Sequence, residues 1–118
     1  MKKIHKNNQL QALILELNVL SNQENVPLWK RLANDLSKPT RQRRIVNLYK
    51  IEQYARDNEI VVVPGKVLGV GEVKKKLTIA AFNFSDEAYE KIKQVGEAIS
   101  INELMKKNPQ GKNVRVLG

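Results

Sequence analysis

The chain has 118 residues, 42% of them apolar, and 21 lysines and arginines against 12 acids, which gives a net charge of +9 and a pI near 9.9. This length supports one globular domain over residues 1–118, and the absence of cysteine excludes disulfides and thiolate metal sites. The excess positive charge favours a polyanionic partner, nucleic acid before an anionic membrane, because like charges destabilise a compact domain.

The N-terminal segment, residues 1–8, carries Lys2, Lys3, Lys6 and the only histidine of the chain, His5. It has neither the long apolar region nor the small-residue cleavage pattern of a signal peptide, so we interpret it as a basic extension. The chain also has no apolar run near the roughly 20 residues that cross a membrane. We therefore expect a cytoplasmic protein without a membrane partner.

Two helices are expected after this extension, at about 9–21 and 27–37. In the first, apolar side chains recur in steps of three and four, the period of one helical face: Leu10, Leu13, Ile14, Leu17 and Leu20. Pro27 suits the first turn of the second helix, and Pro39 ends it because the residue before a proline disfavours helix. The inner face of the second helix is expected to hold Leu28, Trp29, Leu32, Ala33 and Leu36.

A basic stretch follows from Ser37 to Lys50, with no acid among its 14 residues. Near its end, Asn47 is expected to cap a short helix. The inward side chains of that helix are expected to be Leu48, Ile51, Tyr54 and Ala55.

The second half of the chain alternates between β and α patterns. β-branched residues predict a strand at about 60–63, and a largely apolar run predicts a second, central strand at about 77–84. Ser85-Asp86-Glu87 is a typical helix start, so a helix is expected at about 86–96. Shorter elements are expected after it: a strand near 98–101, a helical turn at 102–107 and a strand at 114–117. This order, with helices first, predicts a single mixed α/β domain.

Three glycines, Gly65, Gly69 and Gly71, space the segment that follows the first strand. The segment fails both nucleotide-binding motifs, because the phosphate loop lacks its Ser or Thr and the dinucleotide pattern lacks its third glycine. Pro64-Gly65 fits the middle positions of a type II turn that stops the strand. Two roles stay open for the glycines: turn formation alone, or a backbone that lies close to an RNA phosphate beside Lys66.

No catalytic constellation is found in the sequence. His5 has no orienting partner that sequence can identify, whereas nucleophilic catalysis requires a base beside the nucleophile. Asp86, Glu87 and Glu90 lie in the first turns of a predicted helix, where the helix dipole favours acids. We therefore expect no enzymatic activity, no cofactor and no metal site.

Two basic runs are the strongest candidates for a functional site. Arg41, Arg43 and Arg44 carry guanidinium groups, which bind phosphate bidentately, and Lys74 to Lys76 are consecutive. The aromatic residues are few and most fall on predicted core faces, which favours contacts to the phosphates and sugars of folded RNA over base stacking. The candidate RNA-binding residues are Lys38, Arg41, Arg43, Arg44, Lys50, Lys66, Lys74, Lys75, Lys76, Lys112 and Arg115, with the loop glycines Gly65, Gly69 and Gly71.

Two stretches in the middle of the chain form a distinctive pattern: Val61-Val62-Val63-Pro64-Gly65-Lys66-Val67-Leu68-Gly69 and, after it, Leu77-Thr78-Ile79-Ala80-Ala81-Phe82. They resemble the central signature of a known family, the archaeal and eukaryotic large-subunit ribosomal protein eighteen-e, a relative of bacterial large-subunit protein fifteen. Shorter stretches agree in the same order: Trp29, Leu36-Ser37-Lys38-Pro39 with Arg41, Val46-Asn47-Leu48, Val95-Gly96-Glu97-Ala98, Asn108-Pro109-Gln110-Gly111 and Val114-Arg115-Val116. The resemblance covers nearly the whole chain.

The resemblance implies a structural constituent of the large ribosomal subunit that binds folded rRNA, contacts neighbouring large-subunit proteins and does not form a homo-oligomer. It also implies the short archaeal form and an irregular superhelix of β-β-α turns preceded by two N-terminal helices. Two alternatives stay open beside it. One is a free RNA chaperone or regulator that uses the same basic surface, and the other is a small nucleotide-binding enzyme that uses the glycine loop.

Overall fold

A computed structural model provides the structure of the protein. It describes the backbone of residues 2–38 and 44–117, and the side chains of residues 9–38 and 45–117. The helices are α1 (Lys2–Glu24), α2 (Pro27–Leu36), α3 (Leu48–Tyr54), α4 (Asp86–Lys93) and α5 (Ile101–Lys107). The strands are β1 (Arg44–Asn47), β2 (Ile60–Leu68), β3 (Thr78–Phe84), β4 (Glu97–Ser100) and β5 (Val114–Val116).

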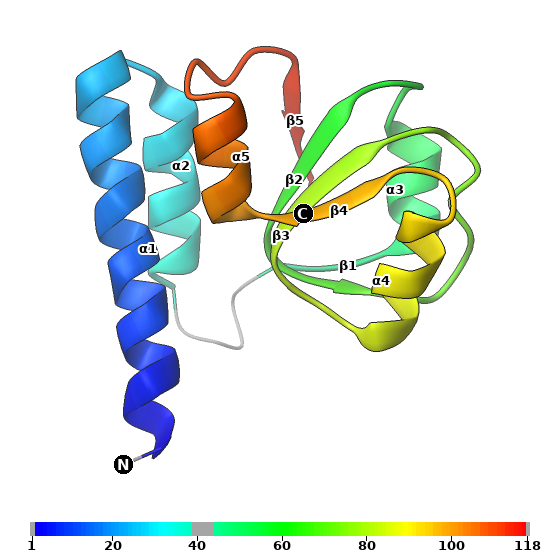
Figure 1. The fold of residues 1–118 in the computed structure, drawn as a ribbon, viewed down its shortest axis with the longest axis horizontal. Coiled ribbons are helices and arrows are strands. Elements are labelled where there is room, and N and C mark those ends of the chain that lie inside the picture. Colours follow the sequence, from blue (N-terminus) through cyan, green and yellow to red (C-terminus); the bar gives the residue numbers. More distant parts are fainter. Residues whose placement is uncertain (1, 39–43, 118) are drawn as a thin grey trace.

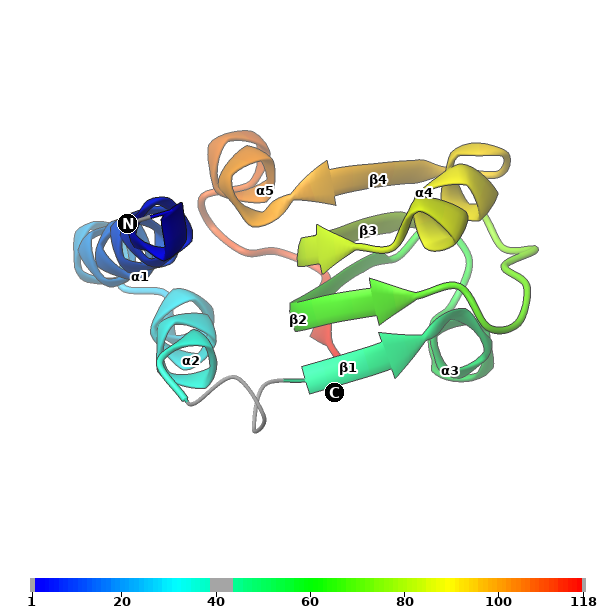
Figure 2. The same ribbon diagram turned by 90° about the horizontal axis from the view of Figure 1, so that it is seen from below.

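These elements form three layers, with the sheet between two groups of helices (Figure 1). Helices α1, α2 and α5 lie on one side, and α3 and α4 lie on the other (Figure 2). Alternate residues of a strand face opposite sides, so β2 contributes to two separate apolar clusters. Val62 packs with Leu17 and Trp29 of the α1–α2 side, whereas Val61 and Val63 belong to the cluster that includes α3 and α4.

The strand pairs of the described sheet are all parallel, and β2 changes neighbours along its length. Strand β3 pairs with one side of β2 along both of its halves. The other side pairs first with β5, over residues 60–62, and then with β1, over residues 65–68. Four strands begin in register with one another, at Ile60, Thr78, Glu97 and Val114.

The change of neighbour coincides with a bulge at Pro64-Gly65. Val63 pairs with Ala81 of β3 and the next pair is Lys66 with Asn83, so two residues of β2 lie opposite one of β3. Proline cannot donate to a sheet ladder and is found at edges and bulges; here the pairing with β5 has ended and the pairing with β1 has not begun. The predicted type II turn is therefore wrong, because β2 continues through this dipeptide without a positive φ.

Side-chain caps fix where the short C-terminal helices begin. Ser85 accepts a hydrogen bond from the backbone N–H of Ala88 at 3.2 Å and starts α4. Ser100 and Glu103 form a reciprocal capping box at the start of α5. Both helices therefore begin directly at the end of a strand.

The predicted single α/β domain with two N-terminal helices is confirmed, and so are the expected strands and helices of the second half within a few residues. Three features differ. Strand β2 is expected at about 60–63 but continues to Leu68. Helix α1 begins at Lys2, so the backbone of the predicted extension is helical from there. Strand β1 is not predicted, because its four residues become a strand only by pairing with β2. The irregular superhelix stays a prediction.

Candidate nucleic-acid interface

The glycine loop after β2, residues 69–71, is held from one side by α4. Lys91 donates hydrogen bonds from Nζ to the carbonyl oxygens of Gly69 and Gly71, at 2.9 and 3.0 Å. The same ammonium group lies 3.3 Å from a carboxylate oxygen of Glu87. A loop that binds phosphate does so through free backbone N–H groups. In this loop, by contrast, the groups that bind Lys91 are carbonyl oxygens.

Helix α3 holds the loop from the other side. The backbone N–H of Tyr49 donates to the carbonyl oxygen of Val70 at 3.0 Å. The N–H of Val70 in turn donates to the side-chain oxygen of Asn47 at 3.4 Å. Asn47 does occupy the cap position of α3, but its side chain makes no cap hydrogen bond there, so the predicted capping role is wrong.

Both loop glycines are explained by close approaches within the chain. A Cβ on Gly69 would lie 2.7 Å from Cγ of Glu87. Gly71 has a φ of +99°, which L side chains rarely adopt, and its Cβ would lie 2.7 Å from the backbone nitrogen of Tyr49. An RNA phosphate is not needed to account for these glycines, and their contact with RNA stays a prediction.

The three consecutive lysines divide into one internal and two external side chains. Lys75 is half-buried, and its Nζ donates to the carbonyl oxygens of Glu52 and Ala55, at 2.6 and 2.7 Å. It thereby satisfies carbonyls at the C-terminal end of α3 that no helical N–H can reach. Lys74 and Lys76 are exposed.

Arg115 is also engaged within the protein. Its Nε and one terminal nitrogen donate to the two carboxylate oxygens of Glu59, at 2.9 and 3.0 Å. The bond from Arg115, together with one from the backbone N–H of Arg56, lowers the pKa of Glu59 to about 2, and Glu59 raises the pKa of Arg115 in return. Arg115 therefore has less capacity for phosphate than its charge alone suggests.

Four exposed cations lie in the segments that precede β2, β3 and β5, at the edge of the sheet where these strands begin. Since β2, β3 and β5 start in register, the segments that precede them meet at this edge; the N–H of Asn58 donates to the carbonyl oxygen of Lys76 across it, at 2.8 Å. We call this surface the basic edge. Its members are Arg56, Lys74, Lys76 and Lys112.

Sequence reasoning missed Arg56, which lies beside an acid, Asp57, and outside any basic run. The signal available in the sequence was its position four residues before a predicted strand; the parallel pairing of that strand with β1, β3 and β5 is known from the structure. Lys112 is a candidate from sequence without an expected location, and the register places it at the same edge as Lys74 and Lys76.

The remaining candidates lie apart from the basic edge. Lys66 is exposed on β2, in register with the exposed Ile45 and Asn83. Lys50 is half-buried on α3, and Lys38 lies 3.4 Å from Asp35 after the end of α2. Three predicted arginines cannot be placed: Arg41 and Arg43 lie outside the described residues, and of Arg44 the structure describes the backbone alone.

The expectation that most aromatic side chains face the core is wrong for the three tyrosines. Tyr49 is 56% exposed, Tyr54 52% and Tyr89 39%. Tyr54 is expected on the inner face of α3, but it is the last residue of that helix and lies beyond its buried face. It precedes Arg56 by two residues in the sequence.

The described residues contain neither a metal-binding cluster nor a membrane-spanning helix. Among the side chains of residues 9–38 and 45–117, no three His, Cys, Asp or Glu come together as a metal site. Within 2–38 and 44–117, no helix is long and apolar enough to cross a membrane.

Comparison with known proteins identifies the family. Residues 8–100 match the family model that describes the ribosomal proteins 50S-L15 and 50S-L18e together with their relative in the 60S subunit. The chain belongs to this family. It is 45% identical over 111 residues to the large ribosomal subunit protein eL18 of Haloarcula marismortui, an alignment that covers 94% of this chain and 96% of that one.

Family members of the same name from other archaea are similar to a comparable degree. The protein of Archaeoglobus fulgidus is 46% identical over 112 residues, which cover 94% of this chain and 96% of that one. The protein of Methanococcus maripaludis is 40% identical over 119 residues, with 99% of both chains covered. The resemblance to the archaeal eighteen-e form is confirmed, and with it the expectation of a ribosomal protein that is not an enzyme.

Proposed function

We propose that this chain is a structural constituent of the large ribosomal subunit in the cytoplasm, where it binds folded large-subunit rRNA and contacts neighbouring ribosomal proteins. The observation that carries the proposal is the 45% identity, over nearly the full length of both chains, to a protein named as part of the large subunit. We further propose that β2, β3 and α4 form one of the β-β-α turns of the family's irregular superhelix.

The basic edge supports rRNA as the partner. Arg56, Lys74, Lys76 and Lys112 are exposed and come from three separate segments, so they form a surface rather than a single flexible run. Phosphates attract such side chains, and each contact releases counterions that are condensed on the nucleic acid. Lys66, Lys50 and the arginines of residues 41–44 are proposed as further contacts.

The dependence of binding on salt tests this proposal. If the protein neutralises roughly six phosphates, a log–log plot of the binding constant against salt should have a slope of about −5. The measurement is filter binding of the full chain to transcribed large-subunit rRNA from the same organism. A slope near zero would contradict rRNA binding through cations.

A matched pair of variants tests the location. Replacing all four basic-edge residues by Gln is expected to reduce the magnitude of the slope by about 3, since each lost phosphate contact removes roughly 0.7–0.9. The control replaces two exposed cations away from this edge, Lys30 and Arg31 of α2, and the losses are compared per charge removed. An equal loss per charge in both variants would show that general charge, and not the basic edge, drives binding.

A further inference from the structure

From residue 9 onward, the outer surface of α1 differs in charge from the rest of the protein, whereas the start of the helix carries Lys2, Lys3 and Lys6. In a chain of net charge +9, residues 9–29 contain two charged side chains, Glu16 and Glu24, and both are acidic. Glu24 accepts a hydrogen bond from Gln110, whereas Glu16 receives one long bond from Asn102, at 3.4 Å. Such a surface, with two acids and no cation, does not attract phosphate.

The same surface carries an exposed apolar stripe. Leu15 is 64% exposed and Val19 44% exposed. They are four residues apart, as neighbours on one helical face are, and Ala12 continues the stripe by one more turn. Apolar side chains grouped on a surface are typical of an interface with another protein.

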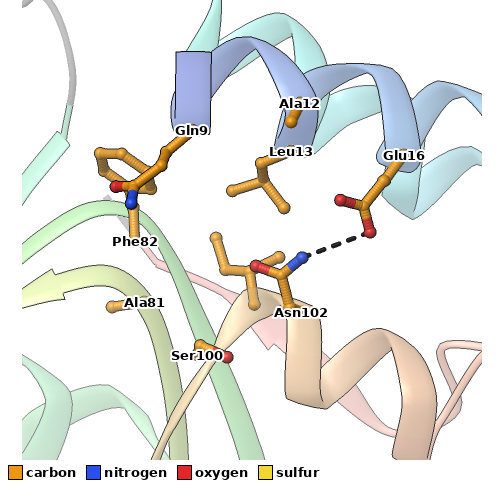
Figure 3. A pocket seen from close by; sticks show the side chains of 9 residues that line it. Gln9, Ala12, Leu13, Glu16, Ala81, Phe82, Ser100 and Asn102 are labelled. Atoms are coloured by element: carbon orange, nitrogen blue, oxygen red, sulfur yellow. Dashed lines mark hydrogen bonds between the residues drawn. The ribbon is translucent and has the colours of Figure 1, made fainter. Parts of the chain in front are cut away.

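A cavity of about 390 Å³ adjoins this stripe, between α1, the end of β3 and the start of α5. Leu13 and Phe82 form part of its apolar wall, and Glu16 lies at its polar side with Asn102 (Figure 3). Among the nine described residues that line it, Glu16 is the one ionisable group. Ala12 lines the cavity and also belongs to the stripe, so the two features form one continuous surface.

We propose that this surface binds a basic segment of a neighbouring large-subunit protein, with a lysine or arginine side chain in the cavity. The aliphatic stem of such a side chain fits against Leu13 and Phe82, and its cationic head meets Glu16, which keeps free acceptor positions beside Asn102. Apolar residues of the same segment cover Leu15 and Val19. The proposal rests on the chain being part of the large subunit.

Photo-crosslinking in assembled subunits tests the partner. A diazirine amino acid at position 15 is carried into large subunits by the full-length chain, the subunits are purified and irradiated, and the crosslinked product is identified by mass spectrometry. The matched control places the same probe at Ile45, which is 65% exposed and lies in register with Lys66 on another part of the molecule. We expect the position-15 probe to attach to a protein, next to a lysine or arginine, and the position-45 probe not to attach to that segment.

A second pair of variants tests the role of the carboxylate. Glu16→Arg is expected to reduce the yield of the position-15 crosslink several-fold, while Glu90→Arg, on exposed α4 surface, leaves it unchanged. A position-15 crosslink to rRNA, or none at all in subunits that contain the protein, would overturn the docking proposal alone. Absence of both probe-bearing chains from the large subunit would overturn the proposed function instead.

Discussion

Glu59 and Arg115 join the starts of two neighbouring strands, because Glu59 precedes β2 and accepts two hydrogen bonds from the guanidinium group of Arg115 in β5. Strand β5 has three residues, and its register with β2 covers residues 60–62 alone. The ion pair therefore stabilises the attachment of β5 to β2, because these two strands share only a short stretch of backbone pairing.

Low pH should weaken the ion pair between Glu59 and Arg115. The pKa of Glu59 is lowered from 4.5 to about 2 in the folded protein, so its contribution is complete above about pH 4.5 and is lost as the pH falls toward 2. Glu59→Gln is expected to lower Tm at neutral pH, and the difference from the unaltered protein should shrink between pH 4.5 and 2.5. Thermal melts at several pH values measure this difference, with Glu90→Gln as the control. A difference that stays constant with pH would contradict the assignment.

The two loop glycines should respond differently to alanine. At Gly71, a Cβ meets backbone atoms of Tyr49 and the φ is +99°, so Gly71→Ala is expected to lower the free energy of unfolding by about 1–3 kcal/mol. At Gly69 the φ is not in the positive region, and the Cβ meets side-chain atoms, Cγ and Cβ of Glu87 at 2.7 and 2.9 Å, rather than backbone. Urea unfolding should therefore show a smaller loss for Gly69→Ala. The reverse order would contradict the described loop.

Substitutions at the neighbouring positions Lys74 and Lys75 should have different effects, one on RNA binding and the other on the stability of the fold. Lys75→Met removes the donors for two carbonyls at the end of α3, and is expected to destabilise the fold by about 1–3 kcal/mol. Lys74→Met should leave stability within about 0.5 kcal/mol, as exposed substitutions usually do, and weaken binding to rRNA. Urea unfolding and filter binding on the two variants make the comparison. Equal effects on stability would show that Lys75 is not the internal lysine.

Trp29 should stabilise the contact between α2 and the segment before β5. Its indole N–H donates to the carbonyl oxygen of Pro109 at 2.8 Å, and its side chain is fully buried. Trp29→Phe keeps an aromatic ring but removes this donor, so the free energy of unfolding is expected to fall by about 1–3 kcal/mol. Unchanged stability in urea unfolding would mean that the hydrogen bond contributes nothing.

Sequence predicts the parts of this fold that depend on local chemistry. The period of Leu13 and Leu17, the serine that begins α4 and the burial of Trp29 follow from helix geometry and capping, and all three agree with the structure. Strand β1 and the bulge at Pro64-Gly65 depend instead on where β2 changes neighbours. That change joins segments far apart in the chain, so no local pattern reports it.

The candidate site shows the same limit. The sequence does not distinguish among the three consecutive lysines, residues 74–76. In the structure only Lys75 donates hydrogen bonds to the carbonyl oxygens of Glu52 and Ala55, which lie 23 and 20 positions earlier in the chain. The basic edge likewise depends on the common register of β2, β3 and β5, which brings Arg56 and Lys112 to one place. Charge predicted the class of partner, and the parallel register decides which of these cations share a surface.

Co-sedimentation with ribosomal subunits tests whether the chain is part of the large subunit. The tagged full-length chain is expressed in its own organism, and cell extract is separated on a sucrose gradient at high salt, where loosely bound RNA-binding proteins dissociate. We expect the chain to sediment with the large subunit, in constant proportion to its rRNA, and to be missing from the small-subunit fractions. Recovery of the chain at the top of the gradient, free of large subunits, would contradict it and would favour a free RNA chaperone or regulator.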